Sequence, residues 1–403
     1  MLFLVYRNIF RHKIRTSLTI STIVFGVVGL ILTGGFIEDI FHNLQEATIH
    51  SQLGHLQLYR AGYSEFGRRD PYKYLMQGAA EITDDIDGIP GVSDVLRRVK
   101  FSGLVNNGHG DLAIIGEGVE PDKEARLGSL LTIISGRQLT AADAYGVQVG
   151  RGVAEALQLE PGDYLTLLAN TTDGALNSLE FEVVGIFRTF ARDYDNRAVR
   201  IPLEAGQDLI GSSGIHSIVV SLESAEATDS VAENLKQKFL SSGYEVKTWY
   251  ELADFYNKTV DLYERQFAVL QSIILFMVLL SVANSVNMAV YERIGEFGTM
   301  MALGDTKRDI FTLVLKENLL LGVLGASLGV VAGVCIAWLI SAIGIEMPPP
   351  PNSDMGYTAH IRLVPEVIVT AFGLGAVATL LASLLPAYRT VQLPLAHALR
   401  QNI

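Results

Sequence analysis

Four stretches of the chain contain no Asp, Glu, Lys or Arg and are apolar over most of their length: Thr16–Ile37, Gln266–Tyr291, Asn318–Ile345 and Val367–Tyr388. Their lengths of 22 to 28 residues suit the roughly 20 apolar residues that a helix needs to cross a bilayer. Buried helices of soluble proteins are usually about 10–14 residues long and keep a polar stripe. The pattern therefore predicts four transmembrane helices. The first is expected to be retained, because its apolar run exceeds the roughly 7–15 residues of a signal peptide.

Residues 38–265 show shorter periods, which predict a folded α+β domain of two lobes. Strands are expected at Leu53–Tyr59, Val95–Leu104, Asp111–Val119, Tyr164–Leu168, Leu179–Arg188, His216–Leu222 and Tyr244–Thr248. Helices are expected at Ala79–Ile86, Val153–Leu157 and Ala225–Leu240, and the first two membrane helices are expected to continue outward as helical stalks. A β-rich lobe (about 136–211) is expected to be inserted into an α/β lobe. The chain thus divides into 1–37, 38–265 and 266–403.

Composition excludes several classes of protein. Hydrophobic residues make up 49% of the chain and charged residues 18%, below the roughly 25% charged of soluble domains. The net charge of -12 gives no reason to expect nucleic acid as a partner. The single cysteine, Cys335, excludes an internal disulfide and a cysteine-based zinc site. The sequence contains no phosphate-binding loop and no catalytic or metal-binding motif, so no cofactor, metal or catalytic residue is expected.

Basic residues in the short loops predict the orientation in the membrane. The loop 292–317 contains Arg293, Lys307, Arg308 and Lys316, whereas the loop 346–366 contains only Arg362. Both chain termini and the loop 292–317 are therefore expected on the cytoplasmic side. The insert contains 19 Lys and Arg against 35 Asp and Glu between residues 38 and 264. Long domains cross largely regardless of charge, so the insert is expected outside.

Four motifs together carry a resemblance to a known family. The segment Glu292–Ile310, with two glutamates four residues apart, then Ala302-Leu303-Gly304 and a polar helix, resembles the signature of FtsX-like ABC permeases. Two end segments are similar to the opening and closing motifs of that family, and one motif in the insert, made of two stretches, is similar to the periplasmic core domain of MacB-type and LolC/LolE-type members. They are Arg7–Leu18, Leu385–Arg400, Gly150–Asp163 and Phe181–Phe187. The resemblance covers essentially the whole chain.

This resemblance implies a permease subunit of an ABC transporter in the bacterial inner membrane, with its large domain in the periplasm. Such permeases work by mechanotransmission: a separate cytoplasmic ATPase dimer hydrolyses ATP, and the permease itself is not an enzyme. A second permease copy or paralogue is the expected partner in the membrane, and a lipoprotein carrier or an adaptor the partner outside. The layout is closest to lipoprotein-releasing permeases. The alternatives are MacB-like efflux through an outer-membrane duct, and an FtsX-like signalling scaffold that controls a cell-wall hydrolase.

The resemblance assigns ATPase coupling to the loop 292–317. Glu292 and Glu296 are expected on one helix face, where like charges four residues apart repel unless a partner neutralises them. A short helix capped near Gly304 and Asp305 is expected to dock on the ATPase. The expected coupling residues are Glu292, Arg293, Glu296, Gly304, Asp305, Lys307 and Arg308. The alternative is an ordinary basic flank that only fixes the topology.

Small and polar residues within the membrane stretches predict helix contacts. Gly325, Gly329 and Gly333 recur every four residues and let another helix approach closely. That helix belongs either to the same chain or to a second subunit. Ser281, Asn284, Ser285 and Asn287 need hydrogen-bond partners in lipid and are expected to face other helices.

The outer ends of the first two membrane helices are the predicted place for acyl chains. The expected groove residues are Leu32, Phe36, Phe267, Leu270 and Ile274, beside Gly34 and Gly35. Transfer of an acyl chain from lipid to protein gains almost nothing from the hydrophobic effect, so binding must come from shape and head-group contacts. The alternative is that these side chains face bulk lipid.

Overall fold

The computed structural model describes residues 13–67, 69–127, 131–189, 191–239, 242–348 and 356–392. The opening motif before Lys13 and the closing motif from Leu393 lie outside these residues. The chain divides into two units. The helical unit comprises the chain up to His42, Val260–Glu346 and the chain from Thr358, and the inserted unit comprises Asn43–Thr259 with Met347–Tyr357.

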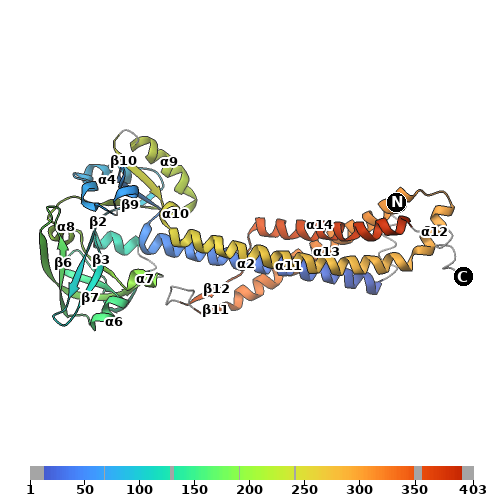
Figure 1. Cartoon of the computed structure of the whole chain (residues 1–403), viewed down its shortest axis with the longest axis horizontal. Helices are drawn as coiled ribbons and strands as arrows, with labels where there is room; N and C mark the ends of the chain where they lie inside the picture. Colours follow the sequence, from blue (N-terminus) through green and yellow to red (C-terminus); the bar gives the residue numbers. More distant parts are fainter. Residues whose placement is uncertain are drawn as a thin grey trace. The chain divides into compact units, whose positions relative to one another are not determined.

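Four long helices coincide with the predicted membrane stretches (Figure 1): α2 (Lys13–Thr48), α11 (Asp254–Glu292), α13 (Lys307–Ile343) and α14 (Pro365–Gln392). All four are long and apolar enough to cross a membrane, which confirms this part of the predicted fold class. Helices α2 and α11 continue beyond the apolar stretches, as expected for stalks. The short elements are α12 (Ile294–Ala302), β11 (Ile345–Met347) and β12 (Tyr357–Ala359).

The three glycines of α13 contact α2 of the same chain. A Cβ atom built on Gly325, Gly329 or Gly333 would lie 3.0, 2.7 or 3.0 Å from the nearest atom of Ile23, Val27 or Ile31, in that order. These distances leave no room for a side chain, so the glycines set the close approach of the two helices. Of the two alternatives for this motif, the structure supports packing within the chain.

The inserted unit is built on a ten-stranded sheet with the order β10-β1-β9-β2-β3-β8-β5-β7-β4, in which β6 pairs with β2 and β7. The strands are β1 (Leu56–Arg60), β2 (Val92–Asn106), β3 (Asp111–Val119), β4 (Thr132–Gly136), β5 (Gly146–Gly150), β6 (Tyr164–Asn170), β7 (Leu176–Arg188), β8 (Ala198–Pro202), β9 (Ser217–Leu222) and β10 (Tyr244–Thr248). All seven predicted strands are present, and β4, β5 and β8 are additional.

The long strand β2 belongs to both lobes. Its first half pairs with β9 in an open antiparallel sheet with β1 and β10. Its second half pairs with β3 and β6, and β6-β7-β5-β8-β3 then closes a ring of strands. The ring therefore takes in residues 98–119, which lie before the predicted range of 136–211.

Short helices cover the sheet of the inserted unit. Ahead of the ring along the chain lie η1 (Ile49–Leu53), α3 (Tyr63–Phe66), η2 (Pro71–Tyr74) and α4 (Ala79–Asp87). The ring region contains α5 (Pro121–Leu127), α6 (Arg151–Leu157), α7 (Arg192–Asp195) and α8 (Leu203–Ile210). The last part of the unit contains η3 (Ala225–Ala227), α9 (Thr228–Phe239) and α10 (Trp249–Leu252).

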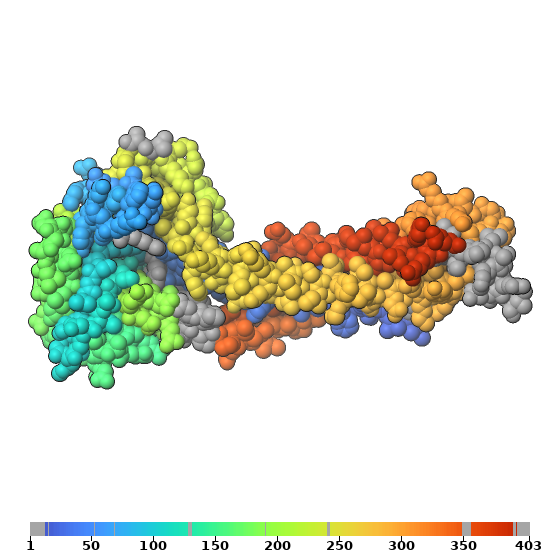
Figure 2. All heavy atoms as spheres, in the orientation of Figure 1, coloured from blue at the N-terminus to red at the C-terminus, as the bar shows by residue number. Residues whose placement is uncertain are grey.

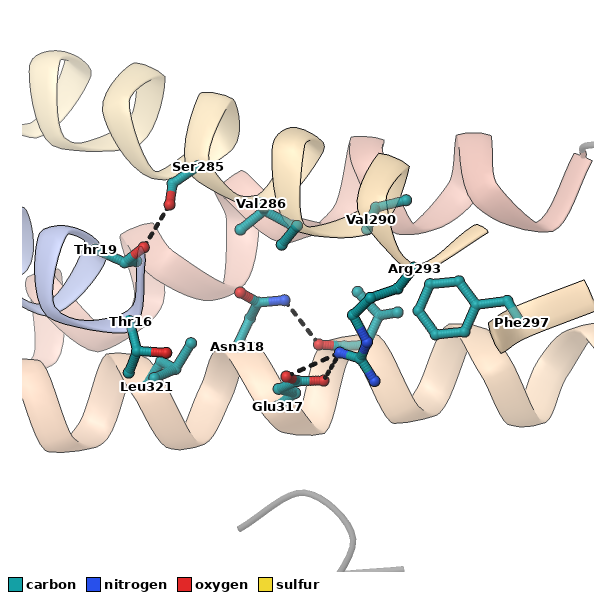
Figure 3. A pocket seen from close by; sticks show the side chains of 12 residues that line it. Thr16, Thr19, Ser285, Val286, Val290, Arg293, Phe297, Glu317, Asn318 and Leu321 are labelled. Atoms are coloured by element: carbon teal, nitrogen blue, oxygen red, sulfur yellow. Dashed lines mark hydrogen bonds and ion pairs between the residues drawn. The ribbon is translucent and has the colours of Figure 1, made fainter. Parts of the chain in front are cut away.

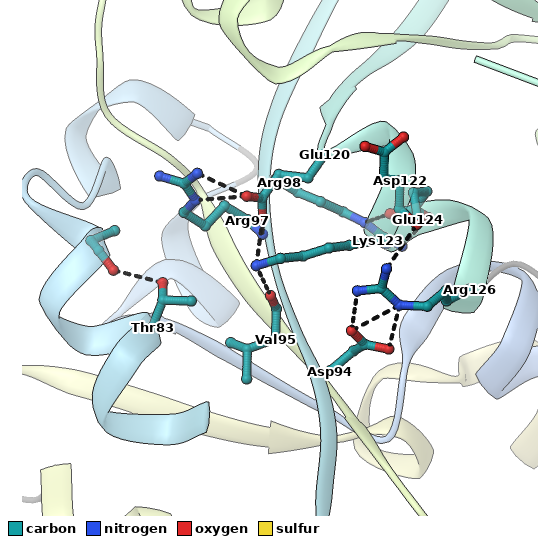
Figure 4. Close-up of polar contacts among 11 residues, drawn as sticks. Thr83, Asp94, Val95, Arg97, Arg98, Glu120, Asp122, Lys123, Glu124 and Arg126 are labelled. Atoms are coloured by element: carbon teal, nitrogen blue, oxygen red, sulfur yellow. Dashed lines mark hydrogen bonds and ion pairs between the residues drawn. The ribbon is translucent and has the colours of Figure 1, made fainter. Parts of the chain in front are cut away.

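A buried charge cluster of Arg98, Glu117, Glu124 and Arg200 lies within the inserted unit; Figure 4 shows its Arg98 and Glu124. Arg98 pairs with Glu124 at 2.5 Å, and Arg200 lies 3.4 Å from Glu124 and 3.6 Å from Glu117. Arg200 also donates to the Ser51 carbonyl at 3.1 Å. Because Ser51 lies in η1, directly after α2, the cluster ties the end of the first stalk to the centre of the sheet.

Candidate functional site

Helix α11 ends at Glu292, and α12 begins after one non-helical residue, Arg293. The expectation that Glu292 and Glu296 share one continuous helix face is therefore wrong. The backbone of Arg293, with φ -108° and ψ 8°, leaves the helical region and starts a new helix in another direction. The periodicity of the sequence does not reveal this break, because contacts made elsewhere hold the side chain of Arg293.

Arg293 ties three helices together (Figure 3). Its Nη1 donates to both carboxylate oxygens of Glu317, on α13, at 3.0 and 2.7 Å. Its Nε donates to Glu296, on α12, at 3.1 Å, and its guanidinium lies 5.1 Å from the centre of the Phe297 ring. Only 8% of Arg293 is exposed. Arg293 therefore fixes the geometry of the turn and is not part of its free surface, whereas the Glu296 side chain is still 42% exposed.

A small polar cavity of about 40 Å³ lies beside this tie. The hydroxyls of Thr19 and Ser285, which line it, hydrogen-bond to each other, and Asn318 donates to the Val314 carbonyl at 2.8 Å (Figure 3). Such a volume accommodates about one water molecule. The buried polar groups at this end of the bundle are thus paired within the chain.

Helix α12 ends in a turn that requires glycine. The Gly304 N–H donates to the Met301 carbonyl at 3.2 Å, and the Asp305 N–H donates to the Met300 carbonyl at 3.0 Å. This pair of bonds defines a Schellman motif, whose C′ residue adopts a left-handed conformation. Gly304 has φ +112°, a conformation that costs an ordinary residue about 1–2 kcal/mol.

Helix α13 begins with a capping box formed by Thr306 and Asp309. The Thr306 N–H donates to the Asp309 carboxylate at 2.9 Å, and the Asp309 N–H donates to the Thr306 hydroxyl at 3.3 Å. The expected cap near Gly304 and Asp305 is therefore shifted to Thr306. Lys307 and Arg308 occupy the first turn of α13.

The segment Ala302–Arg308, called the exposed turn below, is exposed at every position. It includes four of the predicted coupling residues: Gly304, Asp305, Lys307 and Arg308. It also includes Leu303, whose exposed fraction of 84% is unusual for a leucine. An exposed leucine beside one acidic and two basic residues can fill an apolar hollow on a partner while the charges align the contact. The turn is small, but a capped helix on each side holds it rigidly.

A groove of about 280 Å³ lies at the other end of the helical unit. Its apolar wall comes from Leu30, Ile37 and Phe41 of α2, Phe267 and Ala268 of α11, and Val367, Ala371 and Leu374 of α14. Its polar lining includes Glu38, Glu264 and Glu366, one from each helix. Three helices therefore form the groove, not the expected two.

The structure brings only one of the five predicted groove residues to this groove. Phe267 lines it, together with Gly34. Ile274 packs into the core of the helix bundle, and Leu270 is 46% exposed on another face of α11. Leu32 and Phe36 are partly buried and do not line the groove.

The loop before α14 is fastened to α2 beside the groove. The His360 N–H donates to the buried Asp39 carboxylate at 2.9 Å, and the Arg362 N–H donates to the Gly35 carbonyl at 3.0 Å. A Cβ atom on Gly35 would lie 2.6 Å from the Arg362 carbonyl oxygen, so a larger residue would push the loop away.

Sequence reasoning missed Leu303, Glu317 and the α14 wall of the groove. For Glu317 a signal existed: it directly precedes one charge-free stretch, while Arg293 follows shortly after another. Opposite charges at the same edge of two membrane helices favour pairing. Within the described residues, no group of three or more His, Cys, Asp and Glu side chains is placed to hold a metal ion.

Two family models match the chain: the MacB-like periplasmic core domain over residues 16–238, and the FtsX-like permease C-terminal domain over residues 268–395. The chain is 23% identical to an uncharacterized ABC transporter permease, MJ1507, of Methanocaldococcus jannaschii, over 85% of this chain and 84% of that protein. It is also 23% identical to the lipoprotein-releasing system transmembrane protein LolC of Xylella fastidiosa, over 64% of this chain and 65% of that protein.

Among solved structures, the periplasmic region of MacB from Actinobacillus actinomycetemcomitans aligns with a TM-score of 0.38 at 15% identity, over 51% of this chain and 94% of that one. The MacB-like domain model covers more than half of the chain, and the FtsX-like model covers three of the four long helices. The chain therefore belongs to the FtsX-like ABC transporter permeases that contain a MacB-like periplasmic core domain.

Proposed function

We propose that this permease couples a separate cytoplasmic ATPase to the handling of a lipidic substrate, most specifically a lipoprotein, at the outer face of the bacterial inner membrane. The ATPase, as a dimer, docks on the exposed turns of two paired permeases. Movements of α2 and α11 then act on the inserted unit, outside the membrane. The observation that carries the proposal is the three-helix groove, whose walls are apolar and whose polar lining is acidic.

The contacts that hold the exposed turn in place support docking of the ATPase there. A Schellman motif precedes it, a capping box follows it, and Arg293 joins α11, α12 and α13 behind it. A force on Leu303 or Lys307 therefore reaches α11 and α13 without first bending a loose loop. This geometry suits a coupling element better than an ordinary basic flank.

Substitution of the exposed turn tests the docking. Leu303→Glu removes the apolar contact and is expected to weaken ATPase binding about tenfold or more, as for the loss of a central interface residue. Leu176→Glu is the control, because Leu176 is also strongly exposed, at 69%, but lies in the inserted unit. The readouts are co-purification of the ATPase and its substrate-stimulated ATP hydrolysis. Unchanged values for Leu303→Glu would contradict docking at the turn.

The groove supports a substrate with acyl chains. Leu30, Phe41 and Phe267 offer an apolar surface, and Glu38 and Glu264 add negative charge that favours a head group with an amine. A lipidated protein presents acyl chains, and basic side chains of its polypeptide supply the amine. The relative named as a lipoprotein-releasing transmembrane protein supports the same substrate class.

A photoreactive residue at Phe267 tests the substrate, with Leu270 as the matched control on the same helix. Capture of an acylated protein from Phe267 and not from Leu270 is the expected result. Capture of phospholipid alone, together with export of a soluble drug, would favour MacB-like efflux with an adaptor. Capture of nothing, with a cell-wall hydrolase bound outside, would favour an FtsX-like signalling scaffold.

The orientation is a further part of the proposal. A reporter fused after Arg137, in the inserted unit, is expected to act only outside the cytoplasm, and one fused after Gly304 only inside. A cytoplasmic signal from the fusion at Arg137 would overturn the orientation and, with it, the docking of the ATPase on the exposed turn.

A further inference from the structure

The three walls of the groove are held in place in different ways, and Asp39 of α2 accounts for part of the difference. Its neighbour Glu38 lines the groove, whereas Asp39 is buried and accepts the His360 N–H at 2.9 Å. His360 begins the segment of residues 360–364 directly before α14, called the strap below. Asp39 thus fastens one wall of the groove to another, although its own side chain is not part of the lining.

The strap is bonded at two further positions. The Arg362 N–H donates to the Gly35 carbonyl of α2 at 3.0 Å, and the Ile361 N–H donates to the Ser341 hydroxyl of α13 at 2.9 Å. Ile361 itself is 7% exposed. Because hydrogen bonds weaken steeply when their geometry changes, these bonds hold the strap, and with it the start of α14, against α2 and α13.

The body of α14 packs closely against the same two helices. A Cβ atom built on Gly375 would lie 2.6 Å from the Val27 Cγ2 atom of α2 and 3.6 Å from the Ala326 Cβ atom of α13. Helices α2 and α13 meet in turn over the glycines of α13 described above. Helices α2, α13 and α14 therefore form one block, which carries two of the three walls of the groove.

The half of α11 nearer the exposed turn is joined to this block by polar contacts. Arg293, directly after the last residue of α11, bonds to α12 and α13. Ser285 hydrogen-bonds to Thr19 of α2 (Figure 3), and the Ser281 and Thr22 hydroxyls lie 3.4 Å apart. These two serines face another helix, as expected. This half of α11 is therefore held to its neighbours.

The half of α11 that lines the groove is held much less. Within the described part of the chain, residues 264–277 form no hydrogen bond to another helix; those of Arg265 and Ser272 end on α11 itself, at Asp261 and the Ala268 carbonyl. Across its most apolar window 11% of α11 is buried, against 33% for α14 and 50% for α2. In Figure 2 the yellow spheres of α11 lie on the visible face of the helical unit. This half of α11 can therefore move without breaking a hydrogen bond.

The length of α11 converts a small tilt into a change of the groove. Phe267, in the groove wall, lies about 25 residues, and hence about 37 Å of helix, from Glu292 at the end of α11. A tilt of about 5° at that end would displace Phe267 by about 3 Å. Such a displacement changes the width of the groove while the block stays in place.

We propose that Asp39 is a positioning residue: by holding the strap, it keeps the α14 wall fixed to α2 and α13, and α11 is the wall that moves when the groove takes up or releases its ligand. The inference rests on the proposed function, in which acyl chains occupy the groove and the ATPase drives the movement, and it adds which wall moves. Asp39 acts on a backbone N–H and not on the ligand. It therefore needs an acceptor oxygen and not a charge.

Two disulfide locks distinguish the fixed walls from the moving one. In a Cys335→Ala background, which has no other cysteine, Ala326→Cys with Gly375→Cys locks α13 to α14, and Gly26→Cys with Val278→Cys locks α2 to α11. The Cβ atoms of each pair would lie 3.6 Å apart, a distance that suits a disulfide. In the assembled complex, the oxidised α13–α14 lock is expected to leave ATP hydrolysis and release of the acylated protein unchanged. The oxidised α2–α11 lock is expected to abolish both.

Reduction of the disulfide is the internal control, since it restores activity only to a correctly folded complex. Retention of activity in the α2–α11 lock, or its loss in the α13–α14 lock, would overturn the inference. A reduced complex that hydrolyses ATP but releases no acylated protein would refute the proposed substrate alone, because the effect of the two locks on ATP hydrolysis still shows which wall moves.

Substitution of Asp39 tests the positioning role. Asp39→Asn keeps an acceptor oxygen and is expected to behave like the parent chain, whereas Asp39→Ala is expected to lower ATP-driven release about tenfold through loss of a hydrogen bond to a charged group. Spin labels at Val369 on α14 and Leu339 on α13, which are 69% and 55% exposed, are expected to show a broadened distance distribution in Asp39→Ala only. Equal behaviour of the two variants, or an unchanged distance distribution in Asp39→Ala, would overturn the positioning role.

Discussion

The two units of the molecule bury polar groups in different ways. The inserted unit encloses full charges: Arg98 and Arg200 are each 1% exposed and are balanced by Glu117 and Glu124. The helical unit encloses mostly small hydroxyls, such as the Thr19–Ser285 pair, and brings its helices together over glycines. Among the described residues of this unit, the buried charged side chains are Arg293, at one end of the bundle, and Asp39, at the other.

This difference has a mechanical consequence. A buried ion cluster tolerates little displacement, because a small shift leaves a desolvated charge without its partner. Helices that meet over glycines and hydroxyls lose little when they slide by a fraction of a turn. The inserted unit is thus suited to move as a body and the helices to shift against one another, which is what the proposed function requires of them.

The first prediction removes the central charge of the inserted unit. Arg200→Leu removes a positive charge beside Glu117 and Glu124 and the donor of the Ser51 carbonyl, and it is expected to destabilise the inserted unit by about 3–5 kcal/mol. Hydrogen exchange of residues 43–259 in the full chain measures the loss. Arg126→Ala is the control, because Arg126 is 56% exposed where it pairs with Asp94 (Figure 4); a loss below about 1 kcal/mol is expected there. Equal losses of stability in the two variants would contradict the claim that the buried ion pairs matter more than the exposed ones.

The second prediction concerns acid. Burial lowers the pKa of His55 and of His216 to about 4. The unfolded chain, with histidine pKa values near 6.5, then binds more protons than the folded one. Stability is therefore full above pH 6.5 and falls as the pH drops towards 4, by on the order of 2 kcal/mol per histidine at pH 5. His55→Asn, which keeps an acceptor for the Leu222 N–H, is expected to flatten this dependence by about half.

The control for the acid experiment is His109→Gln, because His109 is exposed. The pH dependence of hydrogen exchange in the inserted unit is expected to stay the same in this variant. An unchanged profile in His55→Asn would show that the buried histidines do not cause the acid sensitivity.

The third prediction, with the smallest effect, tests the packing of the helical unit. Gly329→Ala places a Cβ atom 2.7 Å from Val27 and is expected to cost about 1–2 kcal/mol through overpacking. Gly373→Ala on α14 has open space around the new atom and is expected to be neutral or slightly stabilising. Thermal unfolding of the detergent-solubilised chain compares the two. Equal effects would mean that the close contact between α13 and α2 contributes nothing.

The sequence was sufficient for the features that depend on composition alone. A stretch such as Val367–Tyr388, without a charge, has few alternatives to a membrane helix. The sequence was insufficient for features that depend on a contact between residues far apart in the chain. The break at Arg293 depends on Glu317, and the closed ring depends on the two pairings of β2. The groove could not be predicted in full, because one of its walls comes from α14 and the hydrophobic periodicity does not show that α14 lies beside Phe267.

The most direct test of the account is a photoreactive residue in place of Leu303 in membranes that contain the assembled transporter. Photocrosslinking from this residue should join the permease to a chain that 8-azido-ATP also labels. The yield of the crosslinked product should change between the nucleotide-free and ATP-bound states. The same probe at Leu176 should give no such product. Absence of an ATP-labelled partner at Leu303, in a complex that still hydrolyses ATP in response to substrate, would contradict the docking on which the account rests.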